Sequence, residues 1–239
     1  MIGPVVRATI CLPTYNEIAN LEAMLDALQP LLRAGDRVLV IDDSSPDGTG
    51  ELADRLASER PFVDVLHRPE KQGLGPAYVD GFRRALADDA ELVLEMDCDF
   101  SHDPADVPRL IAAVEEGADL ALGSRYVAGG SVADWGLLRR AISRGASVYT
   151  ALFLRMGVHD PTGGFKCFRR RVLETVDLDA VTAKGYAFQI ELTYRAIRAG
   201  FRAVEVPIAF TDRTHGRSKM SRAIVLEAIW RIPLLRLGV

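Results

Sequence analysis

The amino-acid sequence predicts an α/β protein in which a mostly parallel central sheet is flanked by helices and folded as a single domain. Short apolar, β-branched runs alternate with segments of helical periodicity through the first half of the chain. Each run leads into a polar loop, as a parallel sheet with crossover helices requires. The length of 239 residues fits one domain, and the sequence has no internal repeat, low-complexity tract or linker.

The first half contains five expected strands and four expected helices. The strands are short apolar runs at 7–12, 37–41, 62–67, 91–96 and 119–124. Apolar residues at helical spacing predict helices at 16–28, 49–56, about 76–87 and 104–116. Thr49 is the expected N-cap of the second helix, and Gly73 and Gly75 are expected to form a tight turn after the third strand.

After Ser124 this alternation stops. Glycines cluster in VAGGS and PTGGF, and we expect helices at about 137–154 and 187–199, followed by a strand at 201–208. Because no linker intervenes, the second half is expected to complete the same domain and to form the second wall of its cleft. The expected domain therefore spans 1–222 in two halves, 1–124 and 125–222, and an amphipathic segment follows at 223–239.

The two halves differ strongly in charge. Residues 1–124 hold 10 Lys and Arg against 24 Asp and Glu, whereas residues 125–239 hold 19 against 9. The basic half indicates an anionic partner, either phosphate groups or a membrane surface. Nucleic acid is not expected, because the chain has no nucleic-acid-binding motif and a net charge of −4.

The remaining composition favours a protein of a reducing compartment without a membrane span. Cys11, Cys98 and Cys167 have neither paired nor zinc-type spacing and are expected to be buried. The N-terminus has no signal-peptide pattern, and no segment reaches the roughly 20 uncharged apolar residues of a span. The segment 223–239 contains charged residues and Trp230, so it is expected either to lie on a membrane or to pack on its own domain.

Asp97 and Asp99 follow the fourth expected strand in EMDCDFSHDP. An Asp-x-Asp pair alone is common on solvated loops. Here it lies at the carboxyl edge of the predicted sheet, where open α/β folds bind ligands. Carboxylate oxygens suit Mg²⁺ or Mn²⁺, so the position predicts a divalent metal site for a nucleotide diphosphate.

Four loop motifs, PTYNE, DDSSPDGT, KQGLG and DCDFSH, follow the first four expected strands in that order. Together they resemble glycosyltransferase family 2, which implies the Rossmann-like GT-A fold and a nucleotide-sugar donor. In the second half, GSRYVAGG, WGLLRRAISRGAS, DPTGGFKCFRR, KGYAFQIEL and FTDRTHGRSKMS resemble dolichol-phosphate mannose synthases and bacterial polyprenol monophosphomannose synthases. The resemblance runs to about residue 222 and implies a nucleotide-binding first half and an acceptor-binding second half.

This resemblance implies roles for individual residues. Nucleotide binding is implied for Pro13, Tyr15, Glu17, Asp43 and Asp97, and metal binding for Asp97, Asp99 and Ser101. Acceptor phosphate binding is implied for Arg125, Arg139, Arg140 and Ser143, and a part in catalysis for Asp99, Arg125, Arg213 and Lys219.

Several of these residues also have structural explanations. Asp42 or Asp43 could end a strand in an Asx turn. Arg139 and Arg140 could form a solvated helix face, with at most one of them in the cleft. His102, next to the acidic motif, is a candidate for supporting the metal ligands.

The resemblance implies an inverting, metal-dependent transfer of mannose from GDP-mannose to a polyprenyl monophosphate. A phosphate acceptor is largely dianionic at neutral pH, because its second pKa is about 6, so it needs no general base. Glu191 would be a base for a hydroxyl acceptor, or else the partner of Arg195 at i+4. The enzyme is expected on the cytoplasmic face of a membrane as a peripheral protein, with or without a separate membrane-anchoring protein.

Three other functions are considered. A UDP-sugar could replace GDP-mannose as the donor, and a catalytically silent nucleotide-sugar binding module would keep the fold without turnover. A dinucleotide oxidoreductase is disfavoured, since the first strand leads into PTYNE and not into a glycine-rich fingerprint.

Overall fold

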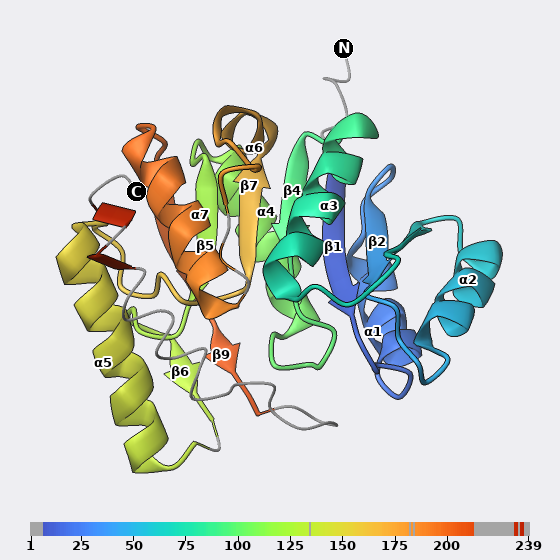
Figure 1. Cartoon of the computed structure of the whole chain (residues 1–239), viewed down its shortest axis with the longest axis horizontal. Coiled ribbons are helices and arrows are strands. Elements are labelled where there is room, and N and C mark those ends of the chain that lie inside the picture. The colour runs from blue at the N-terminus through green and yellow to red at the C-terminus, as the bar shows by residue number, and fades with distance from the viewer. Residues whose placement is uncertain are drawn as a thin grey trace.

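The structure, a computed structural model, describes residues 7–133, 135–181, 183, 185–212, 232–233 and 235–236. Its centre is a seven-stranded sheet of order β3-β2-β1-β4-β7-β5-β8 (Figure 1). The strands are β1 (Ala8–Thr14), β2 (Arg37–Asp42), β3 (Val63–His67), β4 (Leu92–Glu95), β5 (Leu120–Ser124), β7 (Lys166–Arg169) and β8 (Ala203–Pro207). The short strands β6 (Ser131–Val132) and β9 (Ala209–Phe210) pair separately.

The sheet is parallel except at β7. Strands β1 to β4 run parallel, β7 is antiparallel to both β4 and β5, and β5 is parallel to β8. The carboxyl ends of β1 to β5 therefore lie along one edge. The mostly parallel sheet and the five strands of the first half are confirmed. Strand β7 was not predicted, and it separates β4 from β5.

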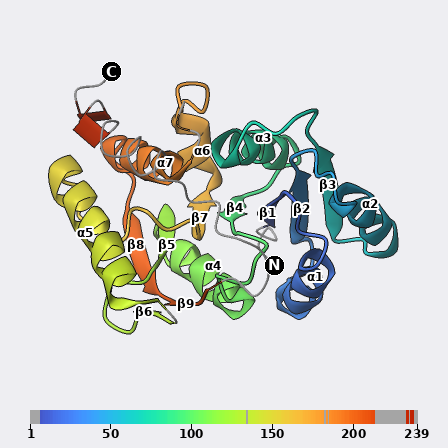
Figure 2. The same cartoon turned by 60° about the horizontal axis from the view of Figure 1, so that its bottom comes forward.

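Helices cover both faces of the sheet (Figure 2). One face carries α1 (Leu21–Leu28), α2 (Thr49–Glu59) and α4 (Val107–Glu115), and the other carries α3 (Leu74–Ala87), α6 (Arg170–Thr175) and α7 (Tyr186–Arg198). Short 3-10 turns occur at Gln29–Leu31 and Pro104–Asp106. Successive β1 residues alternate between two cores, with Ile10 and Leu12 in one and Cys11 in the other. All three cysteines are buried and free, as expected.

Several predicted helix boundaries were wrong. Helix α1 begins at Leu21 and not at residue 16, because Asn16 has φ +57° and the chain then turns through Glu17. Helix α3 begins at Leu74, so Gly75 is helical, while Gly73 makes the expected turn with φ +105°. The fourth predicted helix splits into a 3-10 turn and α4.

Thr49 is not the N-cap of α2 but its first residue, since Gly48 occupies the cap with φ +91°. The Thr49 hydroxyl instead accepts a hydrogen bond from the Glu17 backbone N–H at 3.0 Å and donates to Asp47 Oδ1 at 2.6 Å. The Thr49 hydroxyl therefore links the loop after β1 to the loop after β2.

Helix α5 (Leu137–Leu154) begins and ends as predicted and lies beside the β8 end of the sheet (Figures 1 and 2). Most of the large exposed apolar side chains of the described residues are on it: Leu137, Leu138, Ile142, Val148, Tyr149 and Leu152. In the C-terminal segment, Ile232 is buried in the core, and Arg236 donates to the Phe153 carbonyl at 2.9 Å. These described residues pack on their own domain, and the rest of 223–239 lies largely outside the described residues. No described helix is long and apolar enough to cross a membrane.

Candidate active site

The strand order reverses between β1 and β4, since β1 leads to β2 on one side while β4 lies on the other. Ligands of open α/β sheets bind outside the carboxyl ends at such a point. The loop after β1 carries Tyr15 and Glu17, and the loop after β4 carries Asp97 and Asp99. The strand order alone therefore brings the predicted nucleotide and metal residues to one place.

Asp99 is held by a tight loop. Its Oδ1 accepts the backbone N–H of Ser101 at 3.0 Å and the Ser101 hydroxyl at 2.6 Å. Phe100 between them has φ +59°, which turns the chain sharply. Asp97 Oδ1 accepts the Tyr78 hydroxyl from α3 at 3.3 Å. Both carboxylates lie just past the strand end, as the sequence indicated.

The donor atoms of this loop fit a hard divalent cation. Asp97, Asp99 and Ser101 offer only oxygens, which Mg²⁺ and Mn²⁺ prefer. Within the described ranges, no group of three or more His, Cys, Asp or Glu side chains could hold a metal ion. An ion here would thus need further oxygens from water or a ligand such as a diphosphate.

Asp42 and Asp43, at the carboxyl end of β2, have different roles. Asp42 Oδ2 accepts the Ser45 backbone N–H at 3.2 Å, so Asp42 makes the local turn. Asp43 forms a buried ion pair with Arg68, which follows β3 and also bonds Asp80 at 2.8 Å. Sequence reasoning missed Arg68, although it follows a strand end as the other site residues do.

The remaining predicted nucleotide residues lie in β1 and in the loop that follows it. Pro13 lies in β1, and the backbone N–H of Asp43 donates to the Thr14 carbonyl at 3.0 Å. The Lys71 ammonium lies 3.4 Å from the centroid of the Tyr15 ring. Glu17 is buried, and its Oε2 accepts from the Asn20 amide at 2.8 Å.

Arg125, directly after β5, is buried against Asp160. Its Nε donates to Asp160 Oδ2 and its Nη2 to Oδ1, both at 2.7 Å, in a bidentate pair. Burial raises the pKa of Asp160, but the Arg125 hydrogen bonds and charge outweigh burial and hold that pKa below its usual range. Thr162 joins the pair by accepting from Nη2 at 2.8 Å. Asp160 and Thr162 were not predicted, and only the fold places them next to Arg125.

Helix α5 presents the other predicted acceptor residues to this region. The Tyr126 hydroxyl donates to Ser143 Oγ at 2.7 Å, which ties the loop after β5 to the helix. Arg139 bonds Asp212 at 3.0 Å and stacks on the Trp135 ring at 4.0 Å. Arg140 is exposed and makes no such side-chain contact with other described residues. Of the two arginines, Arg139 is therefore the one that meets the segment beyond β9.

Arg213 and Lys219 lie outside the described residues. The described chain leads up to them at Thr211, whose hydroxyl donates to the Phe100 carbonyl at 3.0 Å and whose N–H donates to the Ser101 carbonyl at 3.3 Å. The segment that holds both residues thus starts beside the acidic loop.

Two further titratable residues, Glu191 and His102, are buried and contact other side chains of the domain. Glu191 is buried and accepts two hydrogen bonds from Arg195, at 2.7 and 3.0 Å, which is the i+4 pairing considered above. His102 packs on Phe165 and Phe210 with ring centroids 5.0 and 5.4 Å away. Burial lowers the pKa of His102 to about 4, so its imidazole is neutral at physiological pH.

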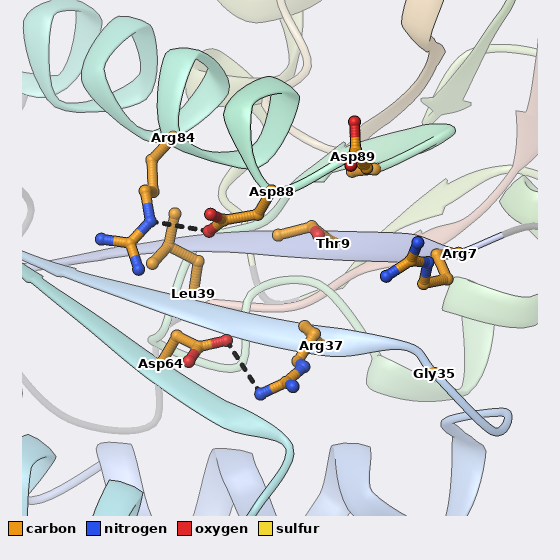
Figure 3. Close-up of a pocket in the computed structure, with 10 residues that line it drawn as sticks. Arg7, Thr9, Gly35, Arg37, Leu39, Asp64, Arg84, Asp88 and Asp89 are labelled. Carbon is orange, nitrogen blue, oxygen red and sulfur yellow. Dashed lines mark hydrogen bonds and ion pairs between the residues drawn. The ribbon is translucent and has the colours of Figure 1, made fainter.

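Two cavities lie elsewhere. One of about 320 Å³ is at the amino edge of the sheet, opposite the acidic loop, where Arg37 faces Asp64 and Arg84 faces Asp88 (Figure 3). These ion pairs, at 3.3 and 2.6 Å, balance most of its charge. The other, about 350 Å³, runs along α5 from Tyr126 and Arg144 and has mainly apolar lining that includes Val148, Leu152 and Val158. It adjoins Ser143, which bonds Tyr126, and its apolar lining suits an apolar ligand better than the charged lining of the first cavity does.

The chain is similar in sequence to a known family and similar in fold to solved structures. Residues 9–177 match the family model described as Glycosyl transferase family 2. The chain is 47% identical over 232 residues to a polyprenol monophosphomannose synthase of Mycolicibacterium smegmatis, covering 97% of this chain and 87% of the relative. It is 47% identical over 224 residues to an undecaprenyl-phosphate mannosyltransferase of Micrococcus luteus, covering 94% and 91%. A glucosyl-3-phosphoglycerate synthase from Mycobacterium tuberculosis, solved with Mn²⁺ and UDP, superposes with a TM-score of 0.72 at 24% identity, covering 98% and 81%.

Proposed function

Because the chain belongs to glycosyl transferase family 2, we propose that it transfers mannose from GDP-mannose to a polyprenyl monophosphate, with inversion, giving polyprenyl phosphomannose and GDP. One observation carries the proposal beyond the relatives' names. The loop of Asp97 and Asp99 lies near Arg125, because the Phe210 ring packs 5.4 Å from the His102 ring at the end of that loop and 5.3 Å from the Arg125 guanidinium. The carboxylates would bind the donor diphosphate through a divalent cation, and Arg125 would bind the acceptor phosphate directly.

On the donor side, Asp97, Asp99 and Ser101 would hold Mg²⁺ or Mn²⁺ together with the diphosphate. A bound divalent ion would stabilise the negative charge that develops on the leaving diphosphate. Asp43, which Arg68 holds in an ion pair, would contact the nucleoside, and Pro13, Tyr15 and Glu17 would line the nucleotide pocket.

On the acceptor side, Arg125, Arg139 and Ser143 would orient the lipid phosphate, with Arg213 and Lys219 from the segment beyond Asp212, while the exposed Arg140 would face the membrane surface. Cationic groups here reduce the repulsion between the dianionic acceptor and the donor diphosphate. Tyr126 lines the cavity along α5 and bonds Ser143, so the lipid chain would enter this cavity from the proposed phosphate site. Its apolar lining suits the first isoprene units.

We propose a peripheral position at the cytoplasmic face of a membrane, because an acceptor of this kind is a membrane lipid. The exposed apolar residues of α5 support it, since a contiguous apolar surface beside Arg139, Arg140 and Arg144 suits an anionic lipid surface. A separate membrane-anchoring protein is compatible with this position.

The decisive experiment supplies purified protein with labelled GDP-mannose, a polyprenyl monophosphate and Mg²⁺ or Mn²⁺, and follows label into the lipid phase. Labelled lipid phosphomannose and free GDP are expected. Transfer only from UDP-sugars would replace the proposed donor. Tight nucleotide-sugar binding without turnover under any metal would favour a silent binding module.

The exposed face of α5 gives a prediction about membranes. Replacing Leu138, Ile142 and Leu152 together by Ser should reduce sedimentation with anionic vesicles about tenfold or more, because each side chain contributes apolar burial at the interface. Ile18→Ser is the control, since Ile18 is an exposed apolar side chain outside α5. Equal vesicle binding by the triple variant and the control would contradict the role of α5.

A second prediction concerns the absence of a general base. Glu191→Gln should keep turnover within about tenfold, because Glu191 is bonded to Arg195 and the acceptor phosphate is its own nucleophile. A base-dependent reaction would lose about 10² to 10⁴ in rate. Single-turnover rates from pH 5 to 8, with folding checked by circular dichroism, distinguish the two. The acid decline should follow the lipid phosphate's second pKa of about 6 in both proteins.

A further inference from the structure

Helix α3 begins within the KQGLG motif, which has no part in the function proposed above. The helix packs on β1 and β4, between which the strand order reverses (Figure 1). Tyr78, at the start of its second turn, is fully buried. Its hydroxyl donates to Asp97 Oδ1 at 3.3 Å, so α3 brings a hydrogen-bond donor to the acidic loop.

The aromatic ring of Tyr78 is held by two neighbouring rings. It stacks on Phe82 of α3, with the ring centroids 5.7 Å apart. It also stacks on Phe188 of α7, with the centroids 5.9 Å apart and the planes 4° from parallel. All three rings are fully buried. Because this packing fixes both side-chain torsions of Tyr78, the hydroxyl oxygen is held beside the carboxylate that it bonds.

Two glycines allow α3 to lie close to its neighbours. Gly75 and Gly81 lie on the same i±3 ridge of the helix as Tyr78. A Cβ at Gly75 would lie 2.3 Å from the Ala183 carbonyl oxygen. A Cβ at Gly81 would lie 2.3 Å from Cδ1 of Ile41 on β2. Glycine is less favourable than alanine inside a helix, so its presence here is explained by the close packing that brings the Tyr78 hydroxyl to the acidic loop.

The hydrogen bond restricts the Asp97 carboxylate. Asp97 lies in a loop beyond the end of β4, where no ladder partner fixes its side chain. A carboxylate is planar, so a donor that holds Oδ1 also limits where Oδ2 can point. Asp97 is partly exposed and can meet a ligand. Tyr78 is fully buried, so it can act on that ligand only through Asp97.

The donor that Tyr78 supplies is neutral, unlike those at two other carboxylates near the site. Asp43 is paired with Arg68, and Asp160 is paired with Arg125. A guanidinium in contact offsets much of the negative charge of a carboxylate. A hydroxyl orients the carboxylate and leaves its net charge unchanged. The Tyr78 hydrogen bond is therefore compatible with the charge that a divalent cation requires of its ligand.

We propose that Tyr78 is a positioning residue of the metal site, whose hydroxyl orients the Asp97 carboxylate for the divalent cation that binds the donor diphosphate. The inference rests on the proposed function, since it needs a metal ion at Asp97 and Asp99. Hydrogen-bonding partners of metal ligands orient those ligands and tune metal affinity. The KQGLG motif then has a role, as the turn that starts the supporting helix.

Tyr78→Phe tests the inference, because it removes the hydroxyl and keeps the stacked ring, so the protein should fold. Mn²⁺ binding to the protein at saturating GDP, corrected for the Mn²⁺ that GDP binds in buffer, is followed by electron paramagnetic resonance of free Mn²⁺. The Kd for Mn²⁺ should be about tenfold higher than in wild type.

Turnover supplies a second readout. The Mn²⁺ concentration for half-maximal mannose transfer should also rise about tenfold in Tyr78→Phe. At saturating Mn²⁺, kcat should return to within about threefold of wild type, because the metal site is weakened but not removed. A purely structural role would instead lower kcat at every Mn²⁺ concentration.

Tyr194→Phe is the matched control. Tyr194 is a buried tyrosine of α7 in the same core as Tyr78, and no hydrogen bond links its hydroxyl to the described residues of the acidic loop. The variant removes the same atom from the same core. Its Mn²⁺ affinity should equal that of wild type.

The titration needs no turnover, so it separates this inference from the proposed function. A wild-type Kd for Mn²⁺ in Tyr78→Phe, or an equal rise in Tyr194→Phe, would overturn the inference even in a protein that transfers mannose. A raised Kd in Tyr78→Phe alone would support the inference even if wild type transferred no mannose. If wild type bound no Mn²⁺ with either GDP or UDP, the metal site and the role of Tyr78 would both be rejected.

Discussion

Asp99→Asn should lower kcat/KM about 10²- to 10³-fold while leaving the fold intact. The loss follows because a metal ligand loses its charge where the leaving diphosphate must be stabilised, an effect of several kcal/mol. The fold should survive because the Asn carbonyl oxygen can still accept the two Ser101 hydrogen bonds that shape the loop. Initial rates across a range of Mg²⁺ and Mn²⁺ concentrations, with thermal unfolding in parallel, measure both effects.

Asp103→Asn is the matched control for that variant. Asp103 lies four residues further on, is exposed, and accepts the backbone N–H of Ala105 at 2.9 Å in the same i+2 pattern. It should keep both activity and metal dependence. Full activity of Asp99→Asn in the presence of a chelator would remove the metal assignment.

Asp160→Asn should lower the free energy of unfolding by about 3–5 kcal/mol, because Arg125 would keep a buried charge without its counter-charge. The acceptor KM should also rise, since the Asp160 carboxylate fixes the Arg125 guanidinium. Urea unfolding and acceptor titration are the two measurements.

The Arg125–Asp160 pair also makes the free energy of unfolding depend on pH. The folded pKa of Asp160 is below its unfolded value, so the stabilisation is present above about pH 4 and is lost as pH falls through the folded pKa. The Asn variant should lack this acid-range loss. Asp212→Asn is the control, because the Arg139–Asp212 pair is about half exposed and should change stability by about 1 kcal/mol or less. If Asp160→Asn and Asp212→Asn lowered the free energy of unfolding equally, burial of the Arg125–Asp160 pair would not explain the loss of stability.

The strands that bury both faces could be predicted from the sequence, because an apolar run such as RVLVI needs no distant partner to be recognised. Strand β7 could not. Two of its four residues are charged, and Lys166 is tolerated inside only because Glu95 and Gln189, 71 and 23 residues away, supply acceptors. Its local sequence resembles a surface turn.

The site residues differ in the same way, between those that a local sequence pattern reveals and those that depend on distant contacts. Asp97 and Asp99 were found because a strand end and a short acidic motif coincide in sequence. Arg68 and Asp160 were missed, since each matters through a side chain 25 or 35 residues away. For Arg139 and Arg140, the helix could be predicted, but its rotation against β9 depends on tertiary packing.

The insertion of β7 between β4 and β5 has a consequence for how the chain acquires its structure during synthesis. When residue 124 leaves the ribosome, β4 and β5 have both been synthesised. No backbone hydrogen bonds can join them yet, because β7 lies between them in the sheet. Strand β4 keeps an open edge until residues 166–169 emerge, about 2–9 s later at 5–20 residues per second. An open edge is prone to pairing with other chains. The nascent protein therefore depends on its second half to protect its first, and a truncation before residue 166 should aggregate rather than yield a smaller nucleotide-binding protein.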